Sequence, residues 1–89
     1  MDYFEIAKVT GLLSDEKYVD MLRYMSKDLR SMADIRKRYS LTASEATRHL
    51  GKLMAVMAVK LYDSTDVNLY YSDPVFMDKY EDIALKLGL

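Results

Sequence analysis

The chain has 89 residues and no cysteine, which leaves room for one domain over residues 1–89 with a single small core. Disulfides and thiolate metal sites are excluded, and a single histidine, His49, argues against an all-protein zinc site. The first residues are acidic, unlike a secretory signal, and no apolar run approaches the ~20 residues of a membrane span. We therefore expect a globular, cytoplasmic protein without metal or cofactor.

The net charge of −1 hides a strong polarity along the chain. Residues 23–60 hold nine basic and three acidic side chains, whereas residues 1–22 and 61–89 are both net acidic. A basic middle segment predicts where a polyanion would bind. The same charges also fit an ordinary solvated face, so the sequence motifs are needed to distinguish this alternative from a polyanion-binding surface.

Apolar spacing predicts a first helix over about residues 2–13 and a second that begins at Ser14-Asp15-Glu16. One face of the second helix carries Tyr18, Met21, Leu22 and Met25. Ser31 followed by Asp34 is a weak capping box for a third helix that ends near Arg38, before a short turn at residues 39–41.

Thr42 and Glu45 form a full capping box for a fourth helix, from residue 43 to about 55 or 57. Apolar and polar residues then alternate over 59–62 and 67–71 around a polar turn, which predicts a β-hairpin. Asp73-Pro74 is a typical helix start. The predicted fold is mainly α with a small β-hairpin (α+β), in the order α-α-α-α-β-β-α.

The third and fourth helices, separated by a short turn, predict a helix-turn-helix. On the fourth helix we expect one face to pack inward, formed by Ala46, Leu50, Leu53 and Met57. The opposite face carries Ser44, Thr47, Arg48 and Gly51. Arg48 can chelate guanine O6 and N7, and the two hydroxyls can bond bases or phosphates, so Ser44, Thr47 and Arg48 are the predicted base-reading residues. An ordinary amphipathic helix is the alternative.

Phosphate contacts are predicted from the helix start and from the basic segment. The helix start, with free amides at Ala43 and Ser44, suits an anion, and Thr42 and Ala43 are the phosphate-binding residues predicted there. The basic candidates are Arg30, Lys37, Arg38, Lys52 and Lys60.

Residues 32–50 resemble the helix-turn-helix of the ArsR-type winged-helix repressors. The likeness lies in Asp34-Ile35, in Leu41-Thr42 at the turn, and in Ser44, Thr47, Arg48, His49 and Leu50. Residues 69–72 are similar to the second wing strand, so the likeness covers about residues 14–73, and MarR-like and several archaeal regulators share part of it. The resemblance implies a winged helix-turn-helix, with the helix-turn-helix at about 32–57, the wing at about 59–72 and a C-terminal dimerisation helix at about 74–87.

Several residues depart from the family pattern. Ser40 stands where the family has glycine in the turn, so a positive φ would strain it. Ser31 and Ala33 occupy the positions of the cysteine pair of thiolate sensors, and the last helix lacks the histidines of the zinc sensors, which argues against metal sensing. The wing tip at residues 63–66 is acidic, so we expect it to contribute little to DNA binding.

The resemblance also implies roles for His49 and for the first and last helices. His49 is expected to point inward as a packed, hydrogen-bonded side chain rather than a switch or ligand. The first and last helices form the dimer interface in the family, although the same side chains also fit an ordinary core. The interface candidates are Tyr3, Phe4, Phe76, Met77, Tyr80, Ile83 and Leu87.

These patterns predict a homodimeric regulator of transcription that binds double-stranded DNA sequence-specifically at a palindromic site. The alternative is a winged-helix protein-interaction module in a transcription or replication assembly, which the acidic wing and overall charge favour. No catalytic triad can be assembled around the single histidine, so we do not expect an enzyme.

Overall fold

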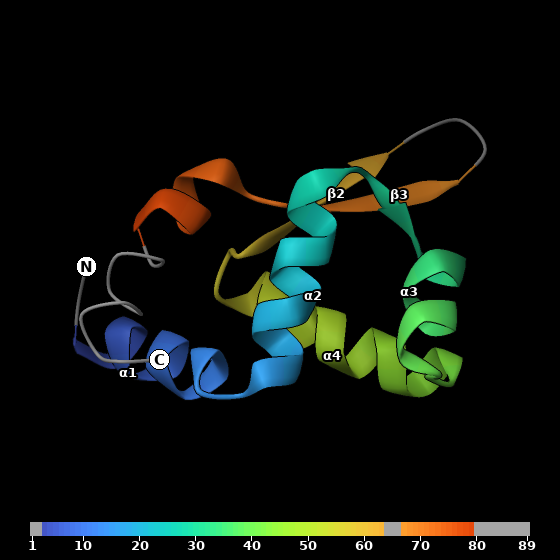
Figure 1. Ribbon diagram of the computed structural model, residues 1–89. Helices are drawn as coiled ribbons and strands as arrows, with labels where there is room; N and C mark the ends of the chain where they lie inside the picture. The colour runs from blue at the N-terminus through green and yellow to red at the C-terminus, as the bar shows by residue number, and fades with distance from the viewer. Residues whose placement is uncertain (1–2, 64–66, 80–89) are drawn as a thin grey trace.

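The computed structural model describes residues 3–63 and 67–79. Its elements in chain order are α1 (Tyr3–Leu13), α2 (Glu16–Lys27), β1 (Arg30–Ser31), α3 (Met32–Tyr39), α4 (Ala43–Ala55), β2 (Val59–Asp63) and β3 (Asn68–Ser72), followed by helical residues 74–79 (Figure 1). This arrangement confirms the predicted mainly α fold with a β-hairpin. The remainder of the last predicted helix lies outside the described residues.

The described strands form one antiparallel sheet in the order β1-β3-β2. The hairpin pairs Val59 with Ser72 and Asp63 with Asn68, while β1 pairs Arg30 with Tyr70. The sequence did not predict β1, because two residues show no periodicity. This short strand ties the start of α3 to the hairpin, which fixes the helix-turn-helix relative to the sheet.

The core lies where α2 packs between the other helices and β3 (Figure 1). The predicted apolar face of α2 is confirmed, since its four residues are all buried. Ser72 is a buried polar residue, and its hydroxyl donates to the Leu22 carbonyl oxygen at 2.6 Å. Among the residues that the structure describes, the other buried apolar ones are Val9, Leu13, Ile35, Leu41, Ala46, Leu50, Leu53, Ala58, Val59 and Phe76.

The predicted start of α2 is confirmed, whereas one expectation about the end of α4 is wrong. Asp15 is the N-cap of α2, within the predicted Ser14-Asp15-Glu16, and its carboxylate accepts from the Lys17 amide at 2.9 Å. The Ser14 hydroxyl instead donates to the Gly11 carbonyl oxygen at the end of α1. Met57 was expected on the packed face of α4, but the helix ends at Ala55. Met57 therefore lies beyond the end of the helix and not on its packed face; it adopts φ 63° and is 64% exposed.

The turn between α3 and α4 is built around Ser40, which lies in the left-handed region at φ 52°, ψ 50°. Its amide donates to the Arg36 carbonyl oxygen, as does the amide of Leu41. Ser40 therefore has a positive φ at the position where the resembling family has glycine. An L-residue is strained here, so this turn costs stability to hold the two helices at their angle.

Candidate nucleic-acid interface

The N-terminus of α4 is fixed by the predicted capping box. The Glu45 amide donates to Thr42 Oγ1 at 3.1 Å, and the Thr42 amide donates to Glu45 Oε1 at 2.9 Å. These bonds to the backbone and hydroxyl of Thr42 hold the pKa of Glu45 below its ordinary value. The carboxylate of Glu45 is therefore committed to the cap, while Thr42, Ala43 and Ser44 at the helix start are exposed.

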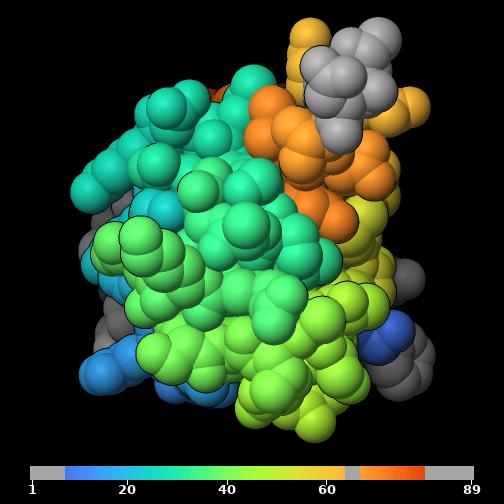
Figure 2. Space-filling model, turned by 90° about the vertical axis from the view of Figure 1, so that its right-hand side faces the viewer, coloured from blue at the N-terminus to red at the C-terminus, as the bar shows by residue number. Residues whose placement is uncertain are grey.

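The two faces of α4 divide as predicted from their spacing, apart from Met57. Ala46, Leu50 and Leu53 are buried in the core. Ser44, Thr47, Arg48 and Gly51 are exposed, and a Cβ at Gly51 would meet nothing within 4 Å. The exposed face thus combines short side chains with one guanidinium. The space-filling view shows α3, α4 and the hairpin together on one side of the molecule (Figure 2).

The predicted phosphate-binding residues divide into two groups. Lys37 on α3 and Lys52 on α4 are exposed. Lys60 lies 3.4 Å from Asp73 Oδ2 in an ion pair. Lys37 and Lys52 are therefore accessible to solvent, whereas Lys60 shares its charge with Asp73.

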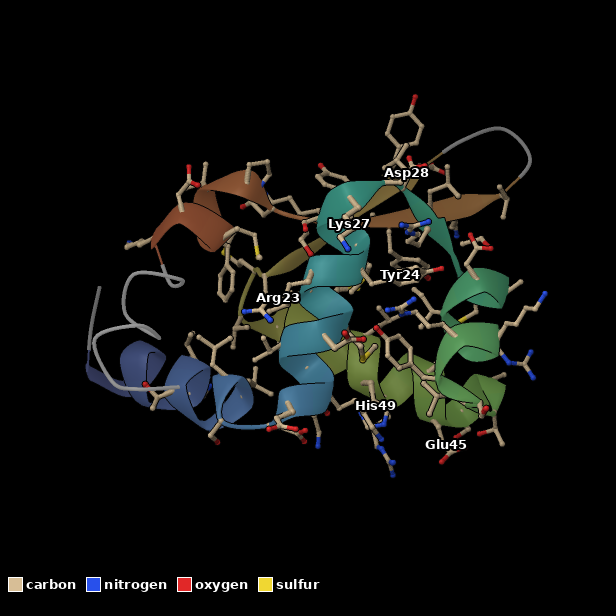
Figure 3. The ribbon with its side chains drawn as sticks, viewed as in Figure 1. Arg23, Tyr24, Lys27, Asp28, Glu45 and His49 are labelled. Atoms are coloured by element: carbon tan, nitrogen blue, oxygen red, sulfur yellow. The ribbon has the colours of Figure 1, made fainter. Side chains whose placement is uncertain are left out.

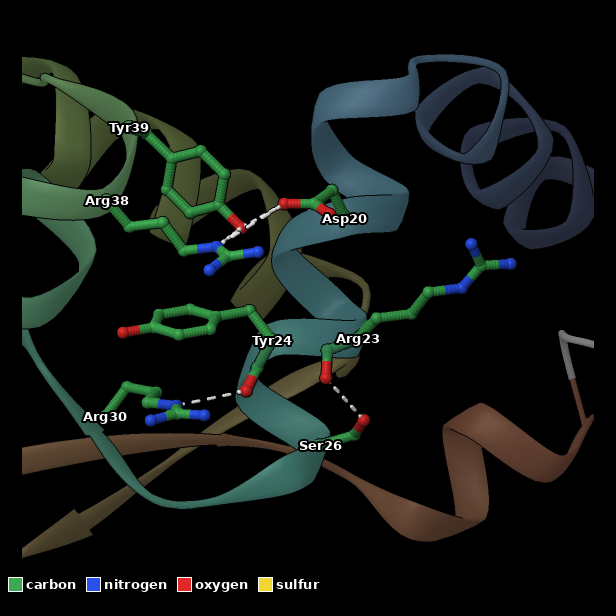
Figure 4. Close-up of polar contacts among 7 residues, drawn as sticks. All are labelled: Asp20, Arg23, Tyr24, Ser26, Arg30, Arg38 and Tyr39. Atoms are coloured by element: carbon green, nitrogen blue, oxygen red, sulfur yellow. Dashed lines mark hydrogen bonds and ion pairs between the residues drawn. The ribbon is translucent and has the colours of Figure 1, made fainter.

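Arg30 and Arg38 are held in a stack that the sequence did not predict (Figure 4). Their guanidinium carbons lie 4.0 Å and 4.4 Å from the centroid of the Tyr24 ring, on opposite faces of that ring. Arg30 Nε donates to the Tyr24 carbonyl oxygen at 3.1 Å. Cation–π stacking on both faces joins α2, β1 and α3. No local signal marks it, because the three residues meet only after the chain has folded.

Tyr39 and Asp20 complete this cluster. The Tyr39 hydroxyl donates to Asp20 Oδ2 at 2.6 Å, and Arg38 Nε donates to the same hydroxyl at 3.3 Å. Arg38 Nε also lies 3.6 Å from Asp20 Oδ2. Burial and the bond to Asp20 raise the pKa of Tyr39 to about 12, so the hydroxyl stays protonated. The cluster gives Arg30 and Arg38 a structural role in addition to any contact with a partner.

His49 packs against α2 and is hydrogen-bonded, as the resemblance implied. Its Nδ1 lies 2.7 Å from the Tyr18 hydroxyl, and the two rings meet edge to face at 5.4 Å. Burial lowers the pKa of His49, and the charges of Lys17, Arg48 and Lys52 lower it further. Figure 3 shows His49 on α4, near the end of α2 that carries Tyr18.

The dimer-interface candidates fall mostly outside the described part. This holds for the side chains of Tyr3 and Phe4 and for Tyr80, Ile83 and Leu87. Phe76 is 5% exposed in the core of the protomer itself, so it is corrected from an interface residue to a core residue. Met77 is partly buried against the same core.

Within the described ranges, no three histidine, aspartate or glutamate side chains gather closely enough to hold a metal ion. The helices found there are too short or too polar to cross a membrane. The predicted acidic wing tip lies largely outside the described residues, with Asp63 exposed at its start.

No protein-family model and no curated protein match the sequence. Solved structures do match. An ArsR-like transcriptional regulator from Rhodococcus sp. RHA1 superimposes with a TM-score of 0.80 at 22% identity, over 97% of this chain and 79% of that one. NolR from Sinorhizobium fredii gives 0.75 at 19% identity, covering 94% and 85%. The homodimeric winged helix-turn-helix DNA-binding domain of a possible ArsR-family transcriptional regulator from Mycobacterium bovis gives 0.76 at 13%, covering 94% and 78%.

The chain has the winged helix-turn-helix fold. In this fold α3 and α4 form the helix-turn-helix, and β2 and β3 form the wing. The exposed short-residue face therefore lies on the second helix of the motif, the helix that enters the major groove in helix-turn-helix proteins.

Proposed function

We propose that this protein is a sequence-specific double-stranded DNA-binding regulator of transcription that acts in the cytoplasm as a homodimer. The observation that carries the proposal is the exposed face of α4, where Ser44, Thr47 and Arg48 stand beside a capped, open helix start. Solved structures of the same fold are described as transcriptional regulators, which supports the proposal.

In this proposal α4 lies in the major groove and Arg48 reads a base edge. A guanidinium matches guanine O6 and N7 with two parallel bonds. Ser44 and Thr47 are short enough to let the helix backbone approach closely and can bond bases or phosphates. Gly51 has no side chain and faces open space, so the exposed face of α4 stays free of bulky groups for a further helical turn.

Phosphate groups would be bound first at the helix start beside Thr42, by the amides of Ala43 and Ser44, and by Lys37 and Lys52. The remaining candidates can bind a phosphate only if they share or leave their present partners; these are Lys60, Arg30 and Arg38. We therefore rank these three below the first group. Phosphate contacts fix the register of the protein on the duplex without selecting its sequence.

The homodimer is the second part of the proposal. Two protomers related by a twofold axis would place their α4 helices about 34 Å apart, one turn of DNA, on a palindromic site. Met77 and the five interface candidates outside the described part remain assigned to this contact. The Mycobacterium bovis domain of the same fold is a homodimer, which supports the assignment.

A protein-interaction module is a second candidate, because of the surface of the wing. Leu61 and Tyr62 on β2 are 41% and 52% exposed, and this strand ends in Asp63. Apolar side chains at an acidic wing suit contact with a protein better than contact with phosphate.

Fluorescence anisotropy with labelled duplex fragments at low salt separates the two candidates. The proposed function predicts saturable binding that weakens steeply as salt is added, because counterions are released from the duplex. Absence of binding at micromolar protein would contradict the DNA-binding proposal. Retention of binding by a Tyr62→Ser variant would further show that the exposed wing surface is not needed for it.

A further inference from the structure

The flank of α4 next to its base-reading face carries a second set of polar groups. Glu45, His49 and Lys52 follow one another at i, i+4 and i+7, so they share one side of the helix. Tyr18 contacts His49, so this flank faces the start of α2, where Lys17 is exposed. Lys17, His49 and Lys52 are called the α2/α4 flank below.

The two nitrogens of the His49 ring differ in their partners. Nδ1 bonds the Tyr18 hydroxyl, whereas Nε2 makes no hydrogen bond to the residues that the structure describes. Among the described residues, every fully buried side-chain nitrogen or oxygen has a hydrogen-bond partner. His49 Nε2 has none, so it is reached by solvent. When Tyr18 donates to Nδ1, the neutral ring carries its proton on Nε2, which then points an N–H donor outward.

The charges around this donor favour an anion. Lys17 from α2 and Arg48 and Lys52 from α4 all act on the ring with positive charge. Glu45 is the acidic group that acts on it, and its carboxylate already accepts from the Thr42 amide. The charges that act on the ring are therefore net positive, and together with burial, the larger cause, they lower the pKa of His49 in the free protein.

We propose that His49 Nε2, with Lys17 and Lys52, binds a phosphate of the DNA backbone, and that this contact couples DNA binding to uptake of a proton. The inference rests on the proposed function. A helix of about 10–12 Å diameter fills a major groove about 12 Å wide, so its flanks lie next to the phosphates on both sides. The α2/α4 flank is one of these two sides.

The Tyr18 hydroxyl lets the ring change its protonation without leaving its place. It donates to Nδ1 of the neutral ring, and by rotating it can accept from Nδ1–H of the charged ring. A phosphate at Nε2 offsets the positive field of Lys17, Arg48 and Lys52. Bound DNA therefore raises the pKa of His49 above its value in the free protein, and affinity increases as pH falls through the pKa of the complex.

The test is DNA affinity from pH 7 to 5.5 at constant salt, for the wild type and a His49→Gln variant. The glutamine amide keeps a donor and an acceptor but does not titrate. We expect the affinity of the wild type to rise about three- to tenfold at low pH, because the complex takes up a proton. The chain has one histidine, so this gain should vanish in His49→Gln. Lys37→Gln should weaken binding at every pH and keep the gain.

Nuclear magnetic resonance can measure the pKa of the His49 ring with and without DNA. If His49 had only a structural role, this pKa would not change when DNA binds. We expect its pKa to rise on saturation with duplex. A Tyr18→Phe variant, which frees the ring, should bind DNA less tightly and still titrate. An unchanged pKa in the complex, or an equal pH dependence in His49→Gln, would overturn the inference while leaving DNA binding intact.

Two further outcomes are also decisive. A ring that responds to inorganic phosphate but not to duplex would mean that the flank takes free phosphate, which contradicts the DNA contact. Failure of the wild type to bind any duplex at any pH would instead remove the proposed function, and this inference with it.

Discussion

At the scale of single residues, the two capping boxes decide where the helix-turn-helix begins. Ser31 with Asp34 and Thr42 with Glu45 each exchange a pair of bonds between side chains and backbone. Both patterns were visible in the sequence because a capping box is local, spanning four consecutive residues. Thr42 is the more informative of the two, since its cap also shapes the proposed phosphate site.

Replacing Thr42 by Ala should lower the free energy of unfolding by about 1 kcal/mol, because one helix-start amide loses its acceptor. Urea denaturation measures this change. Thr42→Ser, which keeps the hydroxyl, is the matched control and should stay close to the wild type. Equal losses in both variants would show that the hydroxyl does not stabilise the helix start.

The caps also predict how stability depends on pH. Bonds from Ser31 and Thr42 lower the pKa values of Asp34 and Glu45 below 3.8 and 4.5. The unfolded chain therefore binds protons more readily than the folded one, so this stability is present above those ordinary values and is lost as pH falls below them. Urea midpoints between pH 6 and 3 should decline less for an Asp34→Asn, Glu45→Gln variant. A parallel decline would contradict the assignment.

Arg48 and Lys37 should behave differently when replaced. Arg48→Ala should reduce discrimination between a preferred and a random duplex by about 1–3 kcal/mol, because a base contact is lost. Lys37→Ala should weaken both duplexes alike and lower the salt slope by about one. Binding isotherms at several salt concentrations test both. Equal losses on the two duplexes for Arg48→Ala would contradict its base-reading role.

At the scale of elements, the helices and the hairpin could be predicted because periodicity and turn residues are local signals. The packed face of α4 was predicted correctly at Ala46, Leu50 and Leu53. It failed at Met57, since the helix ends two residues earlier, and the sequence has no strong stop signal there. The Arg30–Tyr24–Arg38 stack and β1 were missed because both depend on contacts between distant segments.

The turn between α3 and α4 offers a direct test of strain. Ser40 has φ 52°, and glycine adopts this conformation without a steric penalty. Ser40→Gly should raise the free energy of unfolding by about 0.5–1 kcal/mol, since the relief exceeds the added entropy of the unfolded chain. Arg23→Gly on exposed, regular α2 should instead lose about 1 kcal/mol. A loss in Ser40→Gly would show that the turn is not strained by the serine side chain.

At the scale of the whole molecule, a chain of 89 residues buries little core for its surface, so a dimer contact should add to its stability. Folding coupled to association makes the melting temperature rise with protein concentration. Thermal unfolding over about a hundredfold range of concentration, beside sedimentation equilibrium, measures this effect. A constant melting temperature with a monomeric mass would contradict the proposed homodimer.

Selection of bound sequences from a random pool of duplex DNA tests the central claim most directly. The proposed regulator should enrich one motif whose two halves are related by a palindrome and spaced by about one helical turn. Arg48→Ala in the same selection should relax the base preference at a symmetric pair of positions. Recovery of the random pool without enrichment, from protein shown to be folded, would contradict sequence-specific DNA binding through α4.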